Sequence, residues 1–200
     1  MRSTTRMLAD EHELLERLLS WLEALLARAR KRDELDASSM ASLVAFFEAM
    51  VDGLHQDKEE HILFPGLRQR ATPEILEKVE LLFREHQDER RRLEAMRASL
   101  EGAAYGEPIS LDTFLISARA YLELQREHLR AENDWLLPLI ESVLTDEDDQ
   151  RLSAGFRGLE RTRGLRFRHT ARNELNKLEA RFGQLPLSAE LEPSQHLRAG

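Results

Sequence analysis

The chain has 200 residues, of which 42% are hydrophobic and 33% charged, and it contains no cysteine. This size and composition fit one soluble helical domain with a sizeable core, and the lack of cysteine excludes disulfides, thiolate ligands and iron–sulfur clusters. The formal net charge of −8 offers no overall basic surface for nucleic acid. The N-terminus carries no apolar secretion signal, and no stretch approaches the roughly 20 uninterrupted apolar residues that span a bilayer. We therefore expect a cytoplasmic protein with no nucleic-acid or membrane partner.

The first two predicted elements are long helices. The hydroxyl residues at 3–5 suit the start of a helix that runs to about Arg32, with leucines at three- and four-residue spacing along one face. A second helix is predicted from the capping residues at 36–39 to Phe64. The Pro-Gly pair at 65–66 is expected to end it.

Two further helices follow after short turns. A Thr-Pro pair at 72–73 predicts a cap and a first-turn proline, opening a third helix that fades near Gly102. After a turn, Ser110 can cap a fourth helix that reaches about Leu144. Four long helices joined by short loops predict an all-α fold, an up-down-up-down four-helix bundle over residues 1–144.

Residues 145–200 fall outside this pattern and predict a C-terminal helical extension. Thr145 with Asp146, Glu147 and Asp148 after it is typical of the first turn of a helix. An amphipathic stripe at 167–182 is expected to cover the bundle, or else to form a dimer seam or bind a partner helix, so we expect a monomer or a homodimer. The final residues, which contain two prolines, are expected to form a mobile tail.

One sequence pattern occurs twice in the chain. HQDKEEHILFP at 55–65 and HLRAENDWLLP at 128–138 share a histidine, a glutamate four residues later and a proline six residues after that. Each copy is preceded, at nearly the same distance, by another histidine, His12 or His86. Because the beginning of one helix lies beside the end of its antiparallel neighbour, all four histidines fall at a similar level of the predicted bundle.

The spacing within each copy suits metal binding. Residues i and i+4 of an α-helix project from one face about 6 Å apart, and can direct an imidazole nitrogen and a carboxylate oxygen at one small volume. Mixed nitrogen and oxygen ligands are typical of non-haem iron or manganese, whereas structural zinc favours a closed tetrahedron. A ferritin-like di-iron site is disfavoured because no histidine has a glutamate three residues before it. The six expected metal ligands are His12, His55, Glu59, His86, His128 and Glu132.

The competing explanation is that these histidines only pack or hydrogen-bond inside a bundle. Acidic residues are so frequent here that a single His-x3-acid match has little weight, and His12-x3-Glu16 is another match, expected to point into solvent. The two copies at 55–65 and 128–138 carry more weight, since both share the spacing to a proline and both have a preceding histidine.

The combined pattern resembles the haemerythrin-like (HHE cation-binding) family over about residues 6–144. The matching text is KEEHILFP at 58–65, REHQDERRRLEAM at 84–96 and HLRAENDWLLP at 128–138. The resemblance implies a four-helix bundle that holds a non-haem di-iron centre and binds dioxygen or related small ligands. It also implies that Glu59 and Glu132 bridge the two irons and that the four histidines are terminal ligands.

Two positions depart from the oxygen-carrying haemerythrins. Those proteins have a His-x3-His pair in the third helix, whereas in this chain Arg90 lies four residues after His86. Their last motif is His-x4-Asp, whereas here Glu132 comes one residue earlier and Asn133 takes the aspartate's place. One iron therefore lacks a protein nitrogen, which favours reaction with dioxygen, peroxide or nitric oxide over reversible oxygen carriage. The alternatives are an iron- or oxygen-sensing module and an iron donor without turnover.

Three further residues are candidates for roles near the centre. Glu48 and Tyr121 each lie seven residues before a motif histidine, and seven residues of α-helix return to within about 20° of the same stripe. Both are therefore expected to point into the bundle, where they can hydrogen-bond near the ligand pocket and relay protons, or else Glu48 escapes to solvent and Tyr121 only packs. His61 is expected to be a surface residue, with replacement of the missing fifth histidine as the alternative.

Overall fold

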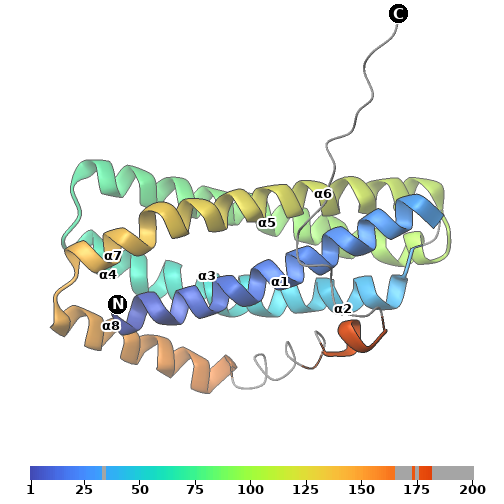
Figure 1. The fold of residues 1–200 in the computed structure, drawn as a ribbon. Helices are drawn as coiled ribbons and strands as arrows, with labels where there is room; N and C mark the ends of the chain where they lie inside the picture. The colour runs from blue at the N-terminus through green and yellow to red at the C-terminus, as the bar shows by residue number, and fades with distance from the viewer. Residues whose placement is uncertain (33–34, 165–172, 174–175, 182–200) are drawn as a thin grey trace, which may run out of the picture.

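The computed structural model describes residues 1–32, 35–164, 173 and 176–181, and its regular elements are all helices, as predicted. Figure 1 shows long helical runs lying side by side, with a shorter run along one side. The runs are α1 (Ser3–Arg32); α2 (Ala37–Phe47), η1 (Glu48–His55), α3 (Gln56–Lys58), η2 (Glu59–Leu63) and α4 (Phe64–Arg68); α5 (Pro73–Ala104); α6 (Pro108–Ala131), η3 (Glu132–Leu136) and α7 (Leu137–Val143); and α8 (Asp146–Leu159) with η4 (Glu160–Gly164).

Several predicted helix boundaries are confirmed. Asp36 begins the second run, and its carboxylate accepts the backbone N–H of Ser39 at 3.2 Å. The third run begins at Pro73, where a proline is tolerated because the first-turn N–H has no partner inside the helix. Thr145 caps α8 in a reciprocal arrangement with Asp148, in which each side chain accepts the other's backbone N–H.

Two predicted boundaries are wrong. The second run does not stop at Pro65 but continues to Arg68, because the turn before the proline is a wider π-helical turn. The fourth run begins at Pro108, two residues before Ser110, which lies in its first turn. Proline is again the first helical residue here, and its fixed φ suits that place.

The core consists of two apolar clusters, one on each side of the histidine level. The larger cluster takes mostly residues that follow His12 and His86 and precede His55 and His128, among them Leu15, Phe47, Leu93 and Phe114. The smaller one takes residues from the other ends of the same runs, together with Leu152 and Phe156 of α8. The histidines therefore lie in a polar layer enclosed by apolar side chains at both ends.

The shorter fifth run is attached to the bundle by both polar and apolar contacts. Asp149 of α8 accepts the backbone N–H groups of Ser3 and Thr4 at 3.0 and 2.9 Å, and so satisfies two donors at the start of α1.

Leu178, in the short described piece 176–181, is buried in the larger cluster. The other members of the 167–182 stripe, Phe167, Ala171, Leu175 and Phe182, lie outside the described residues, as does the predicted tail.

One run is apolar enough to meet a length and composition test for crossing a membrane. This run is Ala37–Arg68, whose most apolar window has a mean hydropathy of 1.3 and is half buried in the fold. Buried core helices of soluble proteins pass the same test, so this finding alone does not assign a membrane span.

Candidate metal centre

The six side chains expected to bind metal meet in the polar layer. His12 comes from α1, His55 and Glu59 from the second run, His86 from α5, and His128 and Glu132 from the α6–η3 junction. All six are at most 2% exposed. They form two groups of possible ligand atoms, each within 4.8 Å of one another: His12, His55, Glu59 and Glu132 in the first, and Glu59, His86, His128 and Glu132 in the second.

The two glutamates belong to both groups and lie between the imidazoles. Glu132 places one oxygen 3.3 Å from His12 Nε2 and the other 3.0 Å from His128 Nε2. Glu59 lies 3.3 Å from His86 Nε2 and 3.9 Å from His55 Nε2. Each histidine occurs in only one group, so the geometry is that of two adjacent positions with shared carboxylates.

A π-helical turn begins at each of these glutamates. The backbone N–H of Phe64 bonds to the carbonyl of Glu59, and the N–H of Leu137 bonds to the carbonyl of Glu132, in both cases five residues back. The next residue in each run is the repeated proline, which has no N–H and whose ring crowds the carbonyl four residues before it. The repeated proline thus favours the wider turn, and π-helical turns occur frequently at functional sites.

Each of the four imidazoles is held from outside through Nδ1. The partner oxygen is Asn133 Oδ1 for His12 at 2.7 Å, Glu11 Oε2 for His55 at 3.1 Å, Glu60 Oε1 for His86 at 2.7 Å, and Glu85 Oε2 for His128 at 2.7 Å. An acceptor at Nδ1 favours the tautomer with its proton there, so that Nε2 can offer a lone pair to a cation, as in metal-ligating histidines generally.

Nearby carboxylates change the protonation of these groups. Burial alone would lower the pKa of His55, but the charge of Glu59, with hydrogen bonds to Glu11 and Glu132, raises it to about 10. Burial would likewise raise the pKa of Glu11, but its hydrogen bond to His55 and the ammonium group of Lys58 lower it to about 2. The pKa of His128 is raised well above its usual value, against the effect of burial, by Glu132 and Glu89. Protons and cations therefore compete for the imidazoles.

The inward-facing atoms of the six residues fit a pair of cations. Within the described part of the chain, Nε2 of His12 and His55 and both oxygens of Glu59 and Glu132 are buried without a hydrogen bond of good geometry. Buried carboxylates are costly unless a positive charge compensates them. Imidazole nitrogens and carboxylate oxygens are donors that iron and manganese accept.

Comparison with protein families agrees with this geometry. The family model described as hemerythrin HHE cation binding domain matches residues 3–140. The chain belongs to this family. No curated protein and no solved structure gives a significant match to it.

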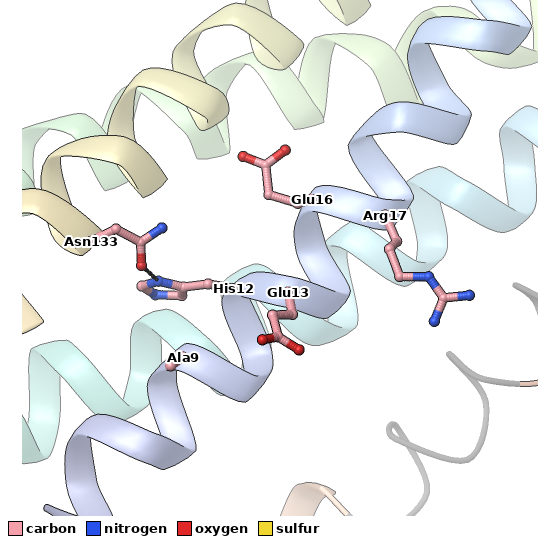
Figure 2. Close-up of a pocket in the computed structure, with 6 residues that line it drawn as sticks. All are labelled: Ala9, His12, Glu13, Glu16, Arg17 and Asn133. Atoms are coloured by element: carbon pink, nitrogen blue, oxygen red, sulfur yellow. Dashed lines mark hydrogen bonds between the residues drawn. The ribbon is translucent and has the colours of Figure 1, made fainter. Parts of the chain in front are cut away.

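In this HHE domain, one ligand of the first group, His12, lies beside a surface pocket. A pocket of about 570 Å³ is lined by Ala9, His12, Glu13, Glu16, Arg17 and Asn133. Figure 2 shows the imidazole of His12 directed at Asn133, with Glu13 and Glu16 extending from the same helix around it. His12 is thus both a member of the buried layer and part of the wall of a surface pocket.

The other sequence candidates have mixed outcomes. Tyr121 is fully buried as expected, and its hydroxyl has no hydrogen-bond partner among the described residues. Glu48 does not point into the bundle but follows the alternative, escape toward solvent: its side chain is 40% exposed and lies 3.4 Å from Arg97 Nε. The seven-residue argument assumed an α-helix, but η1 takes more residues per turn and rotates Glu48 off the stripe of His55. His61 is a surface residue, 70% exposed, near Asp57.

Sequence reasoning missed the outer partners of the HHE domain. Glu11 and Glu85 each precede a leading histidine, and each holds the histidine of a different run, His55 and His128 respectively. The repeated Glu-His pair at 11–12 and 85–86 was the available signal. Lys58 was also missed: it is fully buried and donates hydrogen bonds to Glu11 and to Glu160, the latter at 2.7 Å.

Proposed function

We propose that this chain holds two non-haem iron ions and uses them to bind or react with dioxygen, peroxide or nitric oxide. The observation that carries the proposal is that Glu59 and Glu132 belong to both ligand groups, while each histidine belongs to one. In this assignment, His12 and His55 would hold one ion, His86 and His128 would hold the other, and Glu59 and Glu132 would serve both. Manganese suits the same donors, and zinc suits them less well.

The protein residues have distinct tasks in this proposal. Iron supplies the redox and ligand-binding chemistry when it is bound. Two imidazoles and two shared carboxylates would give each position four protein donors. An octahedral ion takes about six donors, so a small exogenous ligand would have room to bind. Outer acceptors such as Glu11 and Asn133 fix the imidazole tautomers, and the apolar clusters on either side exclude bulk water.

The proposal includes the architecture around the centre. We infer that residues 1–144 form the haemerythrin-like up-down-up-down bundle, that residues 145–200 are an extension of it, and that the protein works in the cytoplasm. The helical runs in Figure 1 support the first two statements as far as the described residues extend.

Metal analysis tests the function directly. The purified protein, supplied with iron(II) under anaerobic conditions, should retain about two ions per chain, and exposure to air followed by azide or peroxide should perturb an oxo-bridge absorption band. Retention of no iron, or of iron that azide and peroxide leave spectroscopically unchanged, contradicts the proposal.

One observation favours a second candidate, an iron or oxygen sensor. Lys58 connects Glu11, the partner of His55, with Glu160 at the end of the α8 run, and its ammonium group lies 5.5 Å from the ring centre of Phe156. Metal binding at His55 can therefore bias the docking of α8 through contiguous contacts. Hydrogen exchange of α8 that is slower with iron than without it supports this candidate, and identical exchange rejects it.

A further inference from the structure

The two ligand groups share one feature of the charge around them. On each side, one outer carboxylate is matched by a cation: Glu11 by the buried Lys58, and Glu60 by Arg90, whose Nη2 lies 2.9 Å from its Oε1. Glu11 holds a histidine of the first group and Glu60 a histidine of the second. These two partners therefore contribute similar net charge to the two positions.

The remaining two imidazoles have different partners. His128 Nδ1 lies 2.7 Å from the carboxylate of Glu85, with Glu89 Oε1 3.9 Å away. His12 Nδ1 lies 2.7 Å from the amide oxygen of Asn133, which carries no charge. A carboxylate partner makes a ligating imidazole more basic, and loss of such an outer partner typically reduces metal affinity by about 10- to 100-fold. The first group therefore holds a cation less tightly than the second.

The weaker group also has the more exposed outer contact, since Asn133 is exposed whereas Glu85 is about a quarter exposed. His12 and Asn133 both line the pocket of about 570 Å³ in Figure 2. Glu13, Glu16 and Arg17 line the same pocket, so carboxylate oxygens are available to a cation beside His12. The imidazole of His12 belongs to the first group and also lines this pocket, and its Nδ1 is held there by the amide oxygen of Asn133.

We propose that the two metal positions are unequal, and that Asn133 is the positioning residue that makes them so. The position of His86 and His128 fills first and retains its ion, whereas the position of His12 and His55 fills second and exchanges its ion through the pocket beside Asn133. This inference rests on the proposed pair of ions and adds an order of filling and a route of exchange.

Titration with cobalt(II), followed by its visible absorption, separates the two positions without oxygen chemistry. Wild-type protein should bind two ions in two steps whose affinities differ by about tenfold or more. The reciprocal exchanges Asn133→Asp and Glu85→Gln are matched in size and swap amide for carboxylate. Asn133→Asp should tighten the weaker binding step by about tenfold and leave the tighter step unchanged. Glu85→Gln should weaken the tighter step by about tenfold.

A histidine variant assigns the steps to positions. His12→Ala should keep the tight step and lose the weak one. In a separate measurement, a chelator such as EDTA should remove one ion quickly from the wild-type protein, and should remove the corresponding ion more slowly from Asn133→Asp. A single step for both ions, a tight step lost in His12→Ala, or an Asn133→Asp titration identical to wild type overturns the inference while leaving the metal pair intact. A wild-type protein that takes up neither cobalt nor iron overturns the proposed function itself.

Discussion

The bundle has two halves, one around His12 and His55 and one around His86 and His128. They have the same kinds of inner ligand and different outer surroundings. In both, a histidine and a glutamate four residues apart are followed by a π-helical turn and a proline, and the glutamate carbonyl accepts the same five-residue hydrogen bond. Outside the layer, the half around His55 has the buried Lys58 and contacts to α8, whereas the half around His128 has Glu85, which is about a quarter exposed.

This difference shows which part of a repeated motif is fixed by geometry and which part is free to vary. The inner ligands must reach one small volume from four helices, so their spacing is the same in both copies. The outer partners only need to present an oxygen to Nδ1, so a carboxylate or an amide on different helices can serve. Two halves with equal ligands can therefore differ in affinity, stability and attachment to α8.

The largest expected effect comes from removing one motif histidine from each half. The double variant His55→Ala with His128→Ala should retain almost no iron, because each position then has one imidazole. The single variants sharpen the comparison. If the position of His86 and His128 fills first, His128→Ala should lose more metal than His55→Ala. Metal content is measured after gel filtration, with the exposed His61→Ala as the matched control. Unchanged iron in the double variant would contradict the ligand assignment.

The next effect tests the buried cation of the first half. Lys58→Met should lower the free energy of unfolding by about 3–5 kcal/mol, because it leaves Glu11 buried without its ammonium partner. Lys78→Met is the matched control: Lys78 is exposed and lies 4.9 Å from the ring centre of Trp135, so its loss should cost less than about 1 kcal/mol. Urea unfolding of the metal-free proteins measures both. Adding Glu11→Gln to Lys58→Met should recover part of the loss, and no recovery would argue against the pairing.

The pH dependence of stability and of metal affinity should have opposite signs. In the absence of metal the pKa of folded His55 is raised from 6.5 to about 10, so its stabilising contribution is fully present below pH 6.5 and is lost as the pH rises through about 10. Cation affinity should instead increase over this range, since each ion displaces protons from imidazoles. Urea unfolding and cobalt titration across the range measure the two trends. His55→Gln should flatten the first, and a metal-free protein that becomes more stable toward pH 10 would contradict the assignment.

Most of the inner layer could be predicted from the sequence because it depends on spacing alone. The level of His12, His55, His86 and His128 follows from antiparallel helices and their distances from turns, and i, i+4 geometry places Glu59 and Glu132 beside their histidines. The outer partners depend on which neighbouring helix supplies an oxygen at the right height. Glu60 and Asn133 show this, since each follows a ligand directly in sequence yet holds a histidine on another run.

The π-helical segments account for two of the remaining errors. Extrapolation by α-helical angles assigned Glu48 to the inner face, although the wider helix of η1 turns it toward Arg97. The same rule ended the second run at Pro65, where a π-helical turn lets the helix continue. A proline six residues after a ligand glutamate is the sequence signal for such a turn in both halves, whereas η1 contains no proline at all.

The smallest predicted effect concerns the residue after that proline, which is Gly66 in the first half and Leu139 in the second. A Cβ atom added at Gly66 would lie 2.7 Å from Leu152 Cδ2 of α8. Alanine would gain about 0.5–1 kcal/mol in a helix interior, but the forced shift of buried Leu152 should cost about 1–3 kcal/mol. We therefore expect Gly66→Ala to destabilise the protein by about 1 kcal/mol and to speed hydrogen exchange in α8.

Gly158 of α8 provides the control for this prediction. The nearest atom to an added Cβ there is Arg161 Nη2 at 3.8 Å, an ordinary contact. Gly158→Ala should therefore show only the helix-propensity gain of about 0.5–1 kcal/mol, with opposite sign to Gly66→Ala. If both variants stabilise the protein equally, then Leu152 moves aside freely and glycine at 66 is not required for close packing of α8. If only Gly66→Ala loosens α8, the first half differs from the second at this position because it has a helix docked against it.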